Sequence, residues 1–302
     1  DQDGDENYQP TFIPLEGGIP QPAFAEQLAQ SRVHLTLYDP EKNYAYLSAE
    51  SRQEAMVEGF QADLASGNLI PMKASPWGVW AQAYNEDHTL TVFDEAYTAG
   101  DHTLFLWSKN DRETTLLYGV PWEDRLPGQT VPLLGFLGGY ITPGNRGLLM
   151  GTALFSDTYG LGYIDLTHPQ EAFPVTITGA SHSGNGELTG LRHLKGNTYA
   201  VQYNIDGCDW LYEGAFNEDQ RTISMDRILV GIGALSNGVL ESYQYEKDSD
   251  RFVLAYSTAT SPTQIYTLAV VDRQTVQMHT SEHILGIPQD WLSPGEDASY
   301  IS

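Results

Sequence analysis

Residues 104–110, Leu104-Phe105-Leu106-Trp107-Ser108-Lys109-Asn110, form a short apolar run that ends in a polar turn. A run of this kind is typical of a β-strand followed by a hairpin. The pattern recurs along the chain, at residues 8–18, 60–67, 161–167, 210–217 and 264–270. The turns that end these runs fall near residues 17, 67, 110, 168, 218 and 272, about fifty residues apart. The sequence therefore predicts an array of similar structural units.

A repeat of this length is in the range of β-propeller blades, each of which is a four-stranded antiparallel sheet. We predict an all-β propeller with about six blades or blade parts in this sequence and about seven in the parent protein. The first unit has an outer strand at residues 8–15 but no strands before it, so we expect the propeller to cover residues 1–290 with an incomplete first blade. In such an array, function belongs to the loops at either face or to the central channel.

One segment favours a different structure by its composition. Residues 49–64 are rich in strong helix formers, among them Glu54, Ala55 and Met56. The repeat instead predicts the outer strand of a blade at residues 57–64, because this run ends in the same polar turn as the other copies. Tertiary context commonly overrides local propensity, so we predict a strand.

The charge balance limits the classes of partner. The sequence has 15 basic and 40 acidic residues, which gives a formal net charge of −25. This charge repels phosphate groups, so we expect neither nucleic acid nor an anionic membrane as a partner. No apolar run approaches the roughly 20 residues that a membrane span needs. The single cysteine, Cys208, excludes an internal disulfide and suits a reducing compartment, so we predict a cytoplasmic protein.

The sequence shows no convincing constellation for nucleophilic catalysis or metal binding. Residues 179–184 contain Ser181, but Ser183 stands where a nucleophile elbow requires glycine. Cys208 has carboxylates close by on both sides, and these disfavour its thiolate. His279 and His283 are four residues apart, but on a strand or loop rather than a helix. We therefore predict no catalytic residue, no metal and no cofactor in this segment.

Acidic residues leave a second interpretation open. A propeller brings together carboxylates from different blades, as glycoside hydrolysis requires. The acids that could meet in a central channel are Asp39, Asp94, Glu95, Asp165, Asp206 and Glu213. A self-contained propeller glycosidase or lactonase is therefore the alternative function, and a protein-interaction propeller is a third.

Several segments resemble the propeller of the prolyl oligopeptidase family of serine peptidases, which includes the acylaminoacyl peptidases. Residues 191–214 resemble one of its blades, and residues 3–18 are similar to its blade turn and outer strand. Residues 257–266 carry a Ser-Pro pair like the one in the family's last blades. Residues 291–300 resemble the bridge from the propeller to the α/β-hydrolase domain, which implies that residues 291–302 begin this bridge.

The resemblance implies a non-catalytic role. In this family the propeller restricts access to the hydrolase active site, so the chain would be the substrate-gating domain of a peptidase that hydrolyses short peptides. Its implied partners are the C-terminal α/β-hydrolase domain of the same polypeptide and short peptide substrates. The family's catalytic Ser, Asp and His have no counterparts in residues 1–302, so none can be assigned here.

The turn Asp206-Gly207-Cys208-Asp209-Trp210 is our candidate for a substrate-facing site. It joins two carboxylates and a large aromatic side chain where the family resemblance is strongest. We expect Asp206 or Asp209 to be exposed to the amino terminus of a peptide, with Trp210 bracing the loop, because loops on a rigid scaffold commonly carry function. The structural alternative is that Trp210 begins an outer strand and packs between blades.

Overall fold

The computed structural model describes residue 4, residues 6–268, residues 275–295 and residue 298. Almost all regular structure in these residues is β-strand. The only α-helix among them is the single turn α1 (Ala25–Leu28), and the 3-10 turns are η1 (Trp122–Asp124), η2 (Gly233–Leu235) and η3 (Gln289–Trp291). No helix in the described part of the chain has both the length and the apolar character to cross a membrane.

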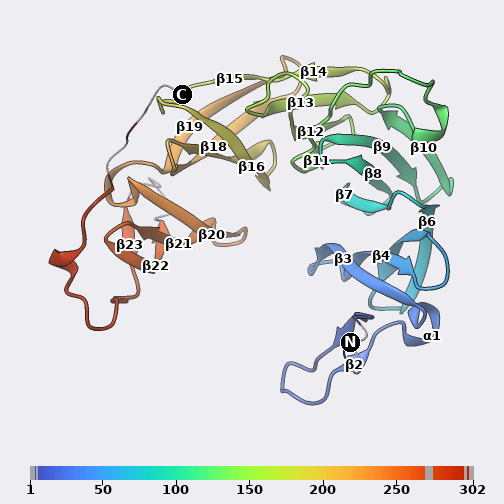
Figure 1. The fold of residues 1–302 in the computed structure, drawn as a ribbon, viewed down its shortest axis with the longest axis horizontal. Coiled ribbons are helices and arrows are strands. Elements are labelled where there is room, and N and C mark those ends of the chain that lie inside the picture. The colour runs from blue at the N-terminus through green and yellow to red at the C-terminus, as the bar shows by residue number, and fades with distance from the viewer. Residues whose placement is uncertain (1–3, 5, 269–274, 296–297, 299–302) are drawn as a thin grey trace. The chain divides into compact units, whose positions relative to one another are not determined.

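The strands form sheets that are consecutive blocks of the chain, so the colour changes steadily from sheet to sheet in Figure 1. A two-stranded sheet comes first and consists of β1 (Thr11–Phe12) and β2 (Gln21–Pro22). The next sheet has the strands β3 (Ser31–Asp39), β4 (Tyr44–Ser51), β5 (Val57–Asp63) and β6 (Asn68–Ser75). It is followed by β7 (Trp80–Tyr84), β8 (Leu90–Thr98), β9 (Asp101–Ser108) and β10 (Glu113–Tyr118).

Three further sheets follow in the same consecutive order. The third four-stranded sheet comprises β11 (Gly139–Ile141), β12 (Gly147–Thr152), β13 (Gly160–Asp165) and β14 (Ala172–Pro174). The fourth comprises β16 (Gly186–Lys195), β17 (Thr198–Ile205), β18 (Cys208–Asn217) and β19 (Thr222–Val230), with β15 (Thr176–Thr178) as an added edge strand. The fifth comprises β20 (Gly238–Glu246), β21 (Arg251–Thr258), β22 (Ser261–Leu268) and β23 (Val276–Met278). Together with the β1–β2 sheet, the described residues contain the six blades or blade parts that the sequence predicts.

The predicted repeat has a simple structural basis. Its copies at residues 60–67, 104–110, 161–167, 210–217 and 264–270 coincide with the third strands β5, β9, β13, β18 and β22, of which residues 269–270 lie outside the described residues. The turns near residues 67, 110, 168 and 218 lead from a third strand to a fourth. The prediction that residues 57–64 form an outer strand is therefore wrong in position. The strand β5 lies inside its sheet, because β6 pairs with it on the side opposite β4. The choice of strand over helix is confirmed.

The edge strand β15 was not predicted. It pairs in parallel with β19, opposite Thr222, Ile223 and Ser224, whereas the other strands of this sheet are antiparallel. Its three residues carry no alternating apolar pattern long enough to identify a strand from sequence.

The chain divides into two compact units. One unit contains Asp1–Leu149 and Tyr163–Ala172, and the other contains Met150–Gly162 and Phe173–Ser302. Apolar side chains fill the space between neighbouring sheets in each unit. In the first unit the core between sheets β3–β6 and β7–β10 includes Tyr46, Met72, Val79, Ala81, Phe93, Phe105 and Trp107. In the second unit the core between sheets β16–β19 and β20–β23 includes Leu194, Leu211, Val230, Leu240, Phe252, Leu254 and Tyr256.

Candidate functional site

The predicted site begins at the tight turn between β17 and β18. Asp206 and Gly207 both have positive φ, 49° and 80°, as the two central residues of a type I′ hairpin require. Asp206 is exposed, and its Oδ1 accepts a hydrogen bond of 3.1 Å from the backbone N–H of Asn185. The structure therefore places one carboxylate of the predicted site at the surface, on a rigid turn.

Asp209 is buried rather than exposed, with a relative accessibility of 5%. Its Oδ2 accepts a hydrogen bond of 2.7 Å from the backbone N–H of Leu240, and its Oδ1 accepts one of 3.2 Å from Asn204 Nδ2. The expectation of a solvent-facing Asp209 is corrected by these contacts, because a buried carboxylate needs partners for its oxygens. Asp209 ties β18 to the start of the next sheet.

Trp210 is half-buried on β18, which is the third strand of its sheet and not an outer strand, since β19 pairs beyond it. Its indole stacks on Tyr212, with ring centroids 6.0 Å apart and an interplanar angle of 13°. The indole also lies against Gly231, where a Cβ atom would be 2.4 Å from a ring carbon. Trp210 therefore packs within its own unit, and of the three predicted residues only Asp206 is exposed.

A loop of serines and a histidine covers this part of β18. The Tyr212 hydroxyl accepts a hydrogen bond of 3.1 Å from the backbone N–H of His182, so its own proton is available to His182 Nδ1 at 2.8 Å. Burial lowers the pKa of His182. Ser181 makes a long backbone contact to the same hydroxyl. The loop is thus anchored to the sheet as a polar connection, as the sequence suggests.

A serine and a histidine do touch elsewhere in the second unit. Ser281 Oγ lies 3.3 Å from His283 Nε2 on an exposed segment. In the contacts of the described residues no carboxylate orients this imidazole, although a catalytic base needs such a third group. Among the residues that the structure describes, no group of three or more His, Cys, Asp or Glu side chains is arranged to hold a metal ion.

The acids considered for a glycosidase site are engaged with separate partners. Asp94 is buried and accepts hydrogen bonds from His102 Nδ1 at 2.7 Å and Gln82 Nε2 at 2.8 Å. Glu95 is also buried, and its carboxylate binds Lys73 and the Tyr97 hydroxyl, each at 2.7 Å. Although adjacent in sequence, these two carboxylates lie in separate polar clusters.

Three more of these acids have partners of their own. Asp165 caps its own turn through Thr167, and Glu213 contacts Arg227 at 3.3 Å. Asp39 belongs to a cluster around His88 that the sequence does not reveal.

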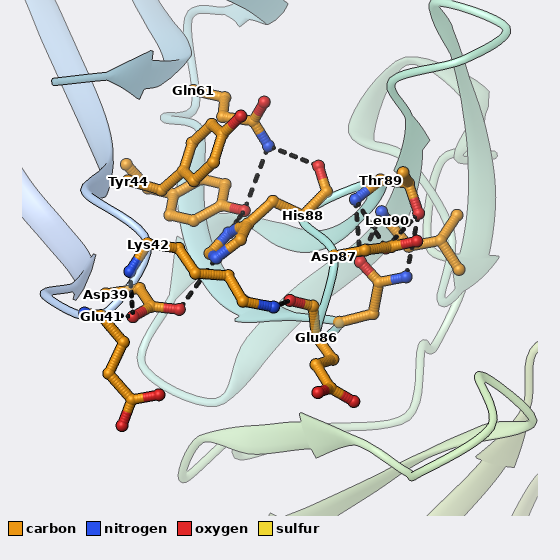
Figure 2. Close-up of polar contacts among 12 residues, drawn as sticks. Asp39, Glu41, Lys42, Tyr44, Gln61, Glu86, Asp87, His88, Thr89 and Leu90 are labelled. Carbon is orange, nitrogen blue, oxygen red and sulfur yellow. Dashed lines mark hydrogen bonds and ion pairs between the residues drawn. The ribbon is translucent and has the colours of Figure 1, made fainter. Parts of the chain in front are cut away.

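The His88 cluster lies between sheets β3–β6 and β7–β10 (Figure 2). His88 Nε2 is 2.9 Å from Asp39 Oδ2, and its Nδ1 is 2.9 Å from the Tyr46 hydroxyl. Gln61 Nε2 donates to both the Tyr46 hydroxyl, at 3.2 Å, and the carbonyl oxygen of His88, at 2.8 Å. His88, Tyr46 and Gln61 have no exposed surface.

Aromatic rings enclose the imidazole on its two faces. Tyr44 stacks on His88 at a centroid distance of 4.3 Å and an angle of 22°, and Tyr84 stacks at 4.6 Å and 21°. Burial lowers the pKa of His88, and burial raises the pKa of Tyr84 to about 12. Burial works against ionisation of Asp39 too, but hydrogen bonds from His88 and from the backbone N–H groups of Lys42 and Glu41 hold the pKa of Asp39 below its ordinary value.

The turn that carries His88 is built by its neighbours. Asn85 Oδ1 accepts hydrogen bonds of 2.9 Å from the backbone N–H groups of both Thr89 and Leu90, and Asp87 contacts Thr89. His88 itself has a φ of 57°. Residues 39–42 and 85–88 are polar and have the composition of turns, which is the one sign of this cluster in the sequence. Nothing in the sequence pairs two side chains that are 49 residues apart.

No protein-family model and no curated protein sequence matches this chain. Among solved structures it is similar to TolB from Acinetobacter baumannii, with 10% sequence identity and a TM-score of 0.52 over 90% of this chain and 60% of that chain. It is also similar to prolyl oligopeptidase B from Galerina marginata, with 11% identity and a TM-score of 0.57 over 84% of this chain and 34% of that chain. The chain thus spans less than two thirds of the length of either protein.

At these identities the similarity is one of fold. The consecutive four-stranded sheets and these neighbours confirm the predicted all-β propeller. The resemblance to a prolyl oligopeptidase propeller, predicted from residues 191–214 and the other segments, is confirmed at the level of the fold.

Proposed function

We propose that the chain is the non-catalytic propeller of a prolyl oligopeptidase-type serine peptidase. In this role it keeps folded proteins away from an α/β-hydrolase active site in the same polypeptide and admits short peptides, which is specificity by exclusion. The observation that carries the proposal is the fold shared with prolyl oligopeptidase B over 84% of this chain but only 34% of that one. A cytoplasmic location is part of the proposal and rests on the single cysteine.

The proposal is tested on the polypeptide encoded by the complete gene. We expect it to cleave short peptides, to cleave an unfolded protein slowly if at all, and to leave the same protein intact when folded. Equal cleavage of folded protein and short peptide would contradict the gating role. Hydrolysis of a glycoside or lactone by residues 1–302 would instead support the alternative of a propeller enzyme.

Residues 1–302 alone are expected to be inert toward peptide esters and unreactive with a fluorophosphonate probe. The reason is that the described residues hold no serine beside a base that is itself oriented by a carboxylate. Intact-mass spectrometry after incubation with the probe checks this prediction. The matched control is Ser281→Ala, because Ser281 is the serine with a histidine contact at 3.3 Å. Stoichiometric labelling that this substitution abolishes would contradict a non-catalytic chain.

Within the complete enzyme, Asp206→Asn is expected to raise KM for peptides with a free amino terminus by about twofold to fivefold, the size of one exposed charge contact. Asp206 is the accessible member of the predicted site, and asparagine tolerates its positive φ. The measurement is steady-state kinetics at low salt, where screening is weakest.

Two controls make this comparison specific. An N-acetylated peptide lacks the ammonium group, so its KM should be unchanged by Asp206→Asn. Asp219→Asn alters an exposed acid in the β18–β19 turn, at the opposite end of the same sheet, and should change neither KM. If Asp206→Asn also leaves the KM of the peptide with a free amino terminus unchanged, Asp206 does not face the substrate.

A further inference from the structure

His88 joins two sheets through hydrogen bonds at both of its ring nitrogens. It lies on the β7–β8 turn. Its partners belong to the other sheet: Asp39 is the last residue of β3, Tyr46 lies on β4 and Gln61 lies on β5. The cluster therefore links sheet β7–β10 to sheet β3–β6. With no exposed surface and tyrosine rings on both faces, the imidazole has no route to water without movement of the turn.

The hydrogen-bond partners determine which ring nitrogen carries the proton. The carbonyl oxygen of His88 can only accept, so the atom of Gln61 that faces it is the amide nitrogen. The same nitrogen donates to the Tyr46 hydroxyl oxygen, which leaves the hydroxyl proton of Tyr46 for His88 Nδ1. Nε2 faces the Asp39 carboxylate and donates to it. His88 is thus neutral, with its proton on Nε2.

A second ring proton disrupts this arrangement. The contact at 2.9 Å cannot hold a donor on both atoms, so protonation of Nδ1 requires the Tyr46 hydroxyl to turn its proton away from His88. The imidazolium would also be a charge with no exposed surface, although the faces of the two tyrosine rings attract a cation. Its hydrogen bond to Asp39 would become stronger, but the Asp39 side chain is 16% exposed and its charge is partly screened.

Two lysine side chains near the cluster disfavour the imidazolium. Lys42 donates from Nζ to the backbone carbonyl of Glu86, on the turn that carries His88 (Figure 2). Lys109 lies over the Tyr44 ring at 4.8 Å and donates to its hydroxyl at 3.2 Å. Both ammonium groups repel a charged His88.

The remaining acids are directed elsewhere. Glu86 enters the cluster through its backbone carbonyl, and Asp87 binds Thr89 on the same turn. Glu41 is exposed and lies in the turn that follows Asp39. Asp39 is therefore the carboxylate that faces the imidazole directly.

We propose that the β7–β8 turn is a proton-operated latch between sheets β3–β6 and β7–β10, closed while His88 is neutral and released when Nδ1 takes up a proton. At acid pH the β7–β8 turn moves away from sheet β3–β6, and His88 becomes exposed to water as imidazolium. The packing between these neighbouring blades is then weakened. The latch is a property of the first unit alone and does not depend on the proposed peptidase function.

The latch predicts a defined loss of protection against hydrogen exchange. Because the closed state excludes the second proton, the open population of residues 84–90 rises about tenfold for each pH unit below about 6.5, until the closed state itself is protonated. Hydrogen exchange with mass spectrometry, corrected for intrinsic rates, should show about tenfold lower protection of this turn at pH ~5.5 than at pH ~7.5. The β17–β18 turn serves as the internal control and should not change.

Two substitutions separate this effect from general acid sensitivity. In His88→Gln the protection of the turn should no longer depend on pH in this range, whatever its absolute level. In His168→Gln, which alters a histidine whose side chain is 73% exposed, the tenfold loss should persist. If the turn in the unsubstituted chain is equally protected at both pH values, the proposal is wrong.

A direct titration of the unsubstituted chain needs no variant. Nitrogen NMR of histidine labelled at both ring nitrogens should show His88 with its proton on Nε2 and with a midpoint below the ordinary value of about 6.5. Asp39→Asn should lower the midpoint further by removing the anion, whereas Tyr46→Phe should raise it by removing the donor to neutral Nδ1. Opposite shifts are expected only if these contacts control the proton. A midpoint at or above about 6.5, or a proton on Nδ1, would exclude the latch.

Discussion

Replacing Lys73 with methionine is expected to lower the free energy of unfolding by about 3–5 kcal/mol, the range for removing one partner of a buried ion pair. Lys73 Nζ is 2.7 Å from Glu95 Oε1 and 3.5 Å from the centroid of the Phe105 ring. The Glu95 side chain is only 3% exposed, and its second oxygen accepts from Tyr97. Without Lys73, a buried carboxylate keeps a single hydroxyl as its partner.

Urea denaturation at neutral pH measures this loss. The matched control is Lys247→Met, which removes an exposed lysine and should change the free energy of unfolding by less than about 0.5 kcal/mol. In the double variant Lys73→Met, Glu95→Gln, more than half of the lost stability should return, because the unpaired charge is gone. A loss below about 1 kcal/mol in the single variant would mean that water compensates Glu95 as it does a surface carboxylate.

Sequence reasoning succeeded here where one pattern is repeated. The turn after Phe60 and Leu64 matches the turn after Trp107, and this match outweighed the helix-forming composition of residues 49–64. A repeat samples the same backbone several times, so its period remains visible even when one copy has unfavourable propensities. For the same reason one strand in each of five sheets could be placed, whereas the single short strand β15 could not.

The polar contacts follow a different logic. His88 and Asp39 are 49 residues apart and meet because two sheets pack side by side. Asp209 is two residues beyond an exposed turn, but its carboxylate points to Leu240, 31 residues further on. Side chains alternate between the two faces of a strand, but the face that each one takes depends on the register. Without the register, the sequence cannot show that Asp206 and Asp209 have different environments. The sequence therefore located the turn itself, but it could not show that Asp206 is exposed and Asp209 is buried.

The exposed and buried members of that turn should respond very differently to substitution. Asp209→Ala is expected to lower the free energy of unfolding by about 2–4 kcal/mol, because it removes a charged acceptor and leaves the Leu240 N–H unpaired in a buried site. The hydrogen bond between Asp209 and Leu240 connects β18 to β20, the first strand of the next sheet. Its loss therefore weakens the packing of sheet β16–β19 against sheet β20–β23.

The asparagine variant tests the cause. In Asp209→Asn the side-chain carbonyl oxygen can still accept from the backbone N–H of Leu240. In the original chain Asn204 donates its amide NH2 to Asp209 at 3.2 Å. In the variant Asn204 can rotate its amide by half a turn, so that its oxygen accepts from the new NH2 group. Its loss should therefore be about half that of alanine or less. Asp206→Asn should leave the free energy of unfolding within about 0.5 kcal/mol of the original chain. Thermal and urea unfolding measured in parallel check all three variants. Equal losses for alanine and asparagine at position 209 would show that the negative charge itself, rather than the count of acceptors, stabilises this contact.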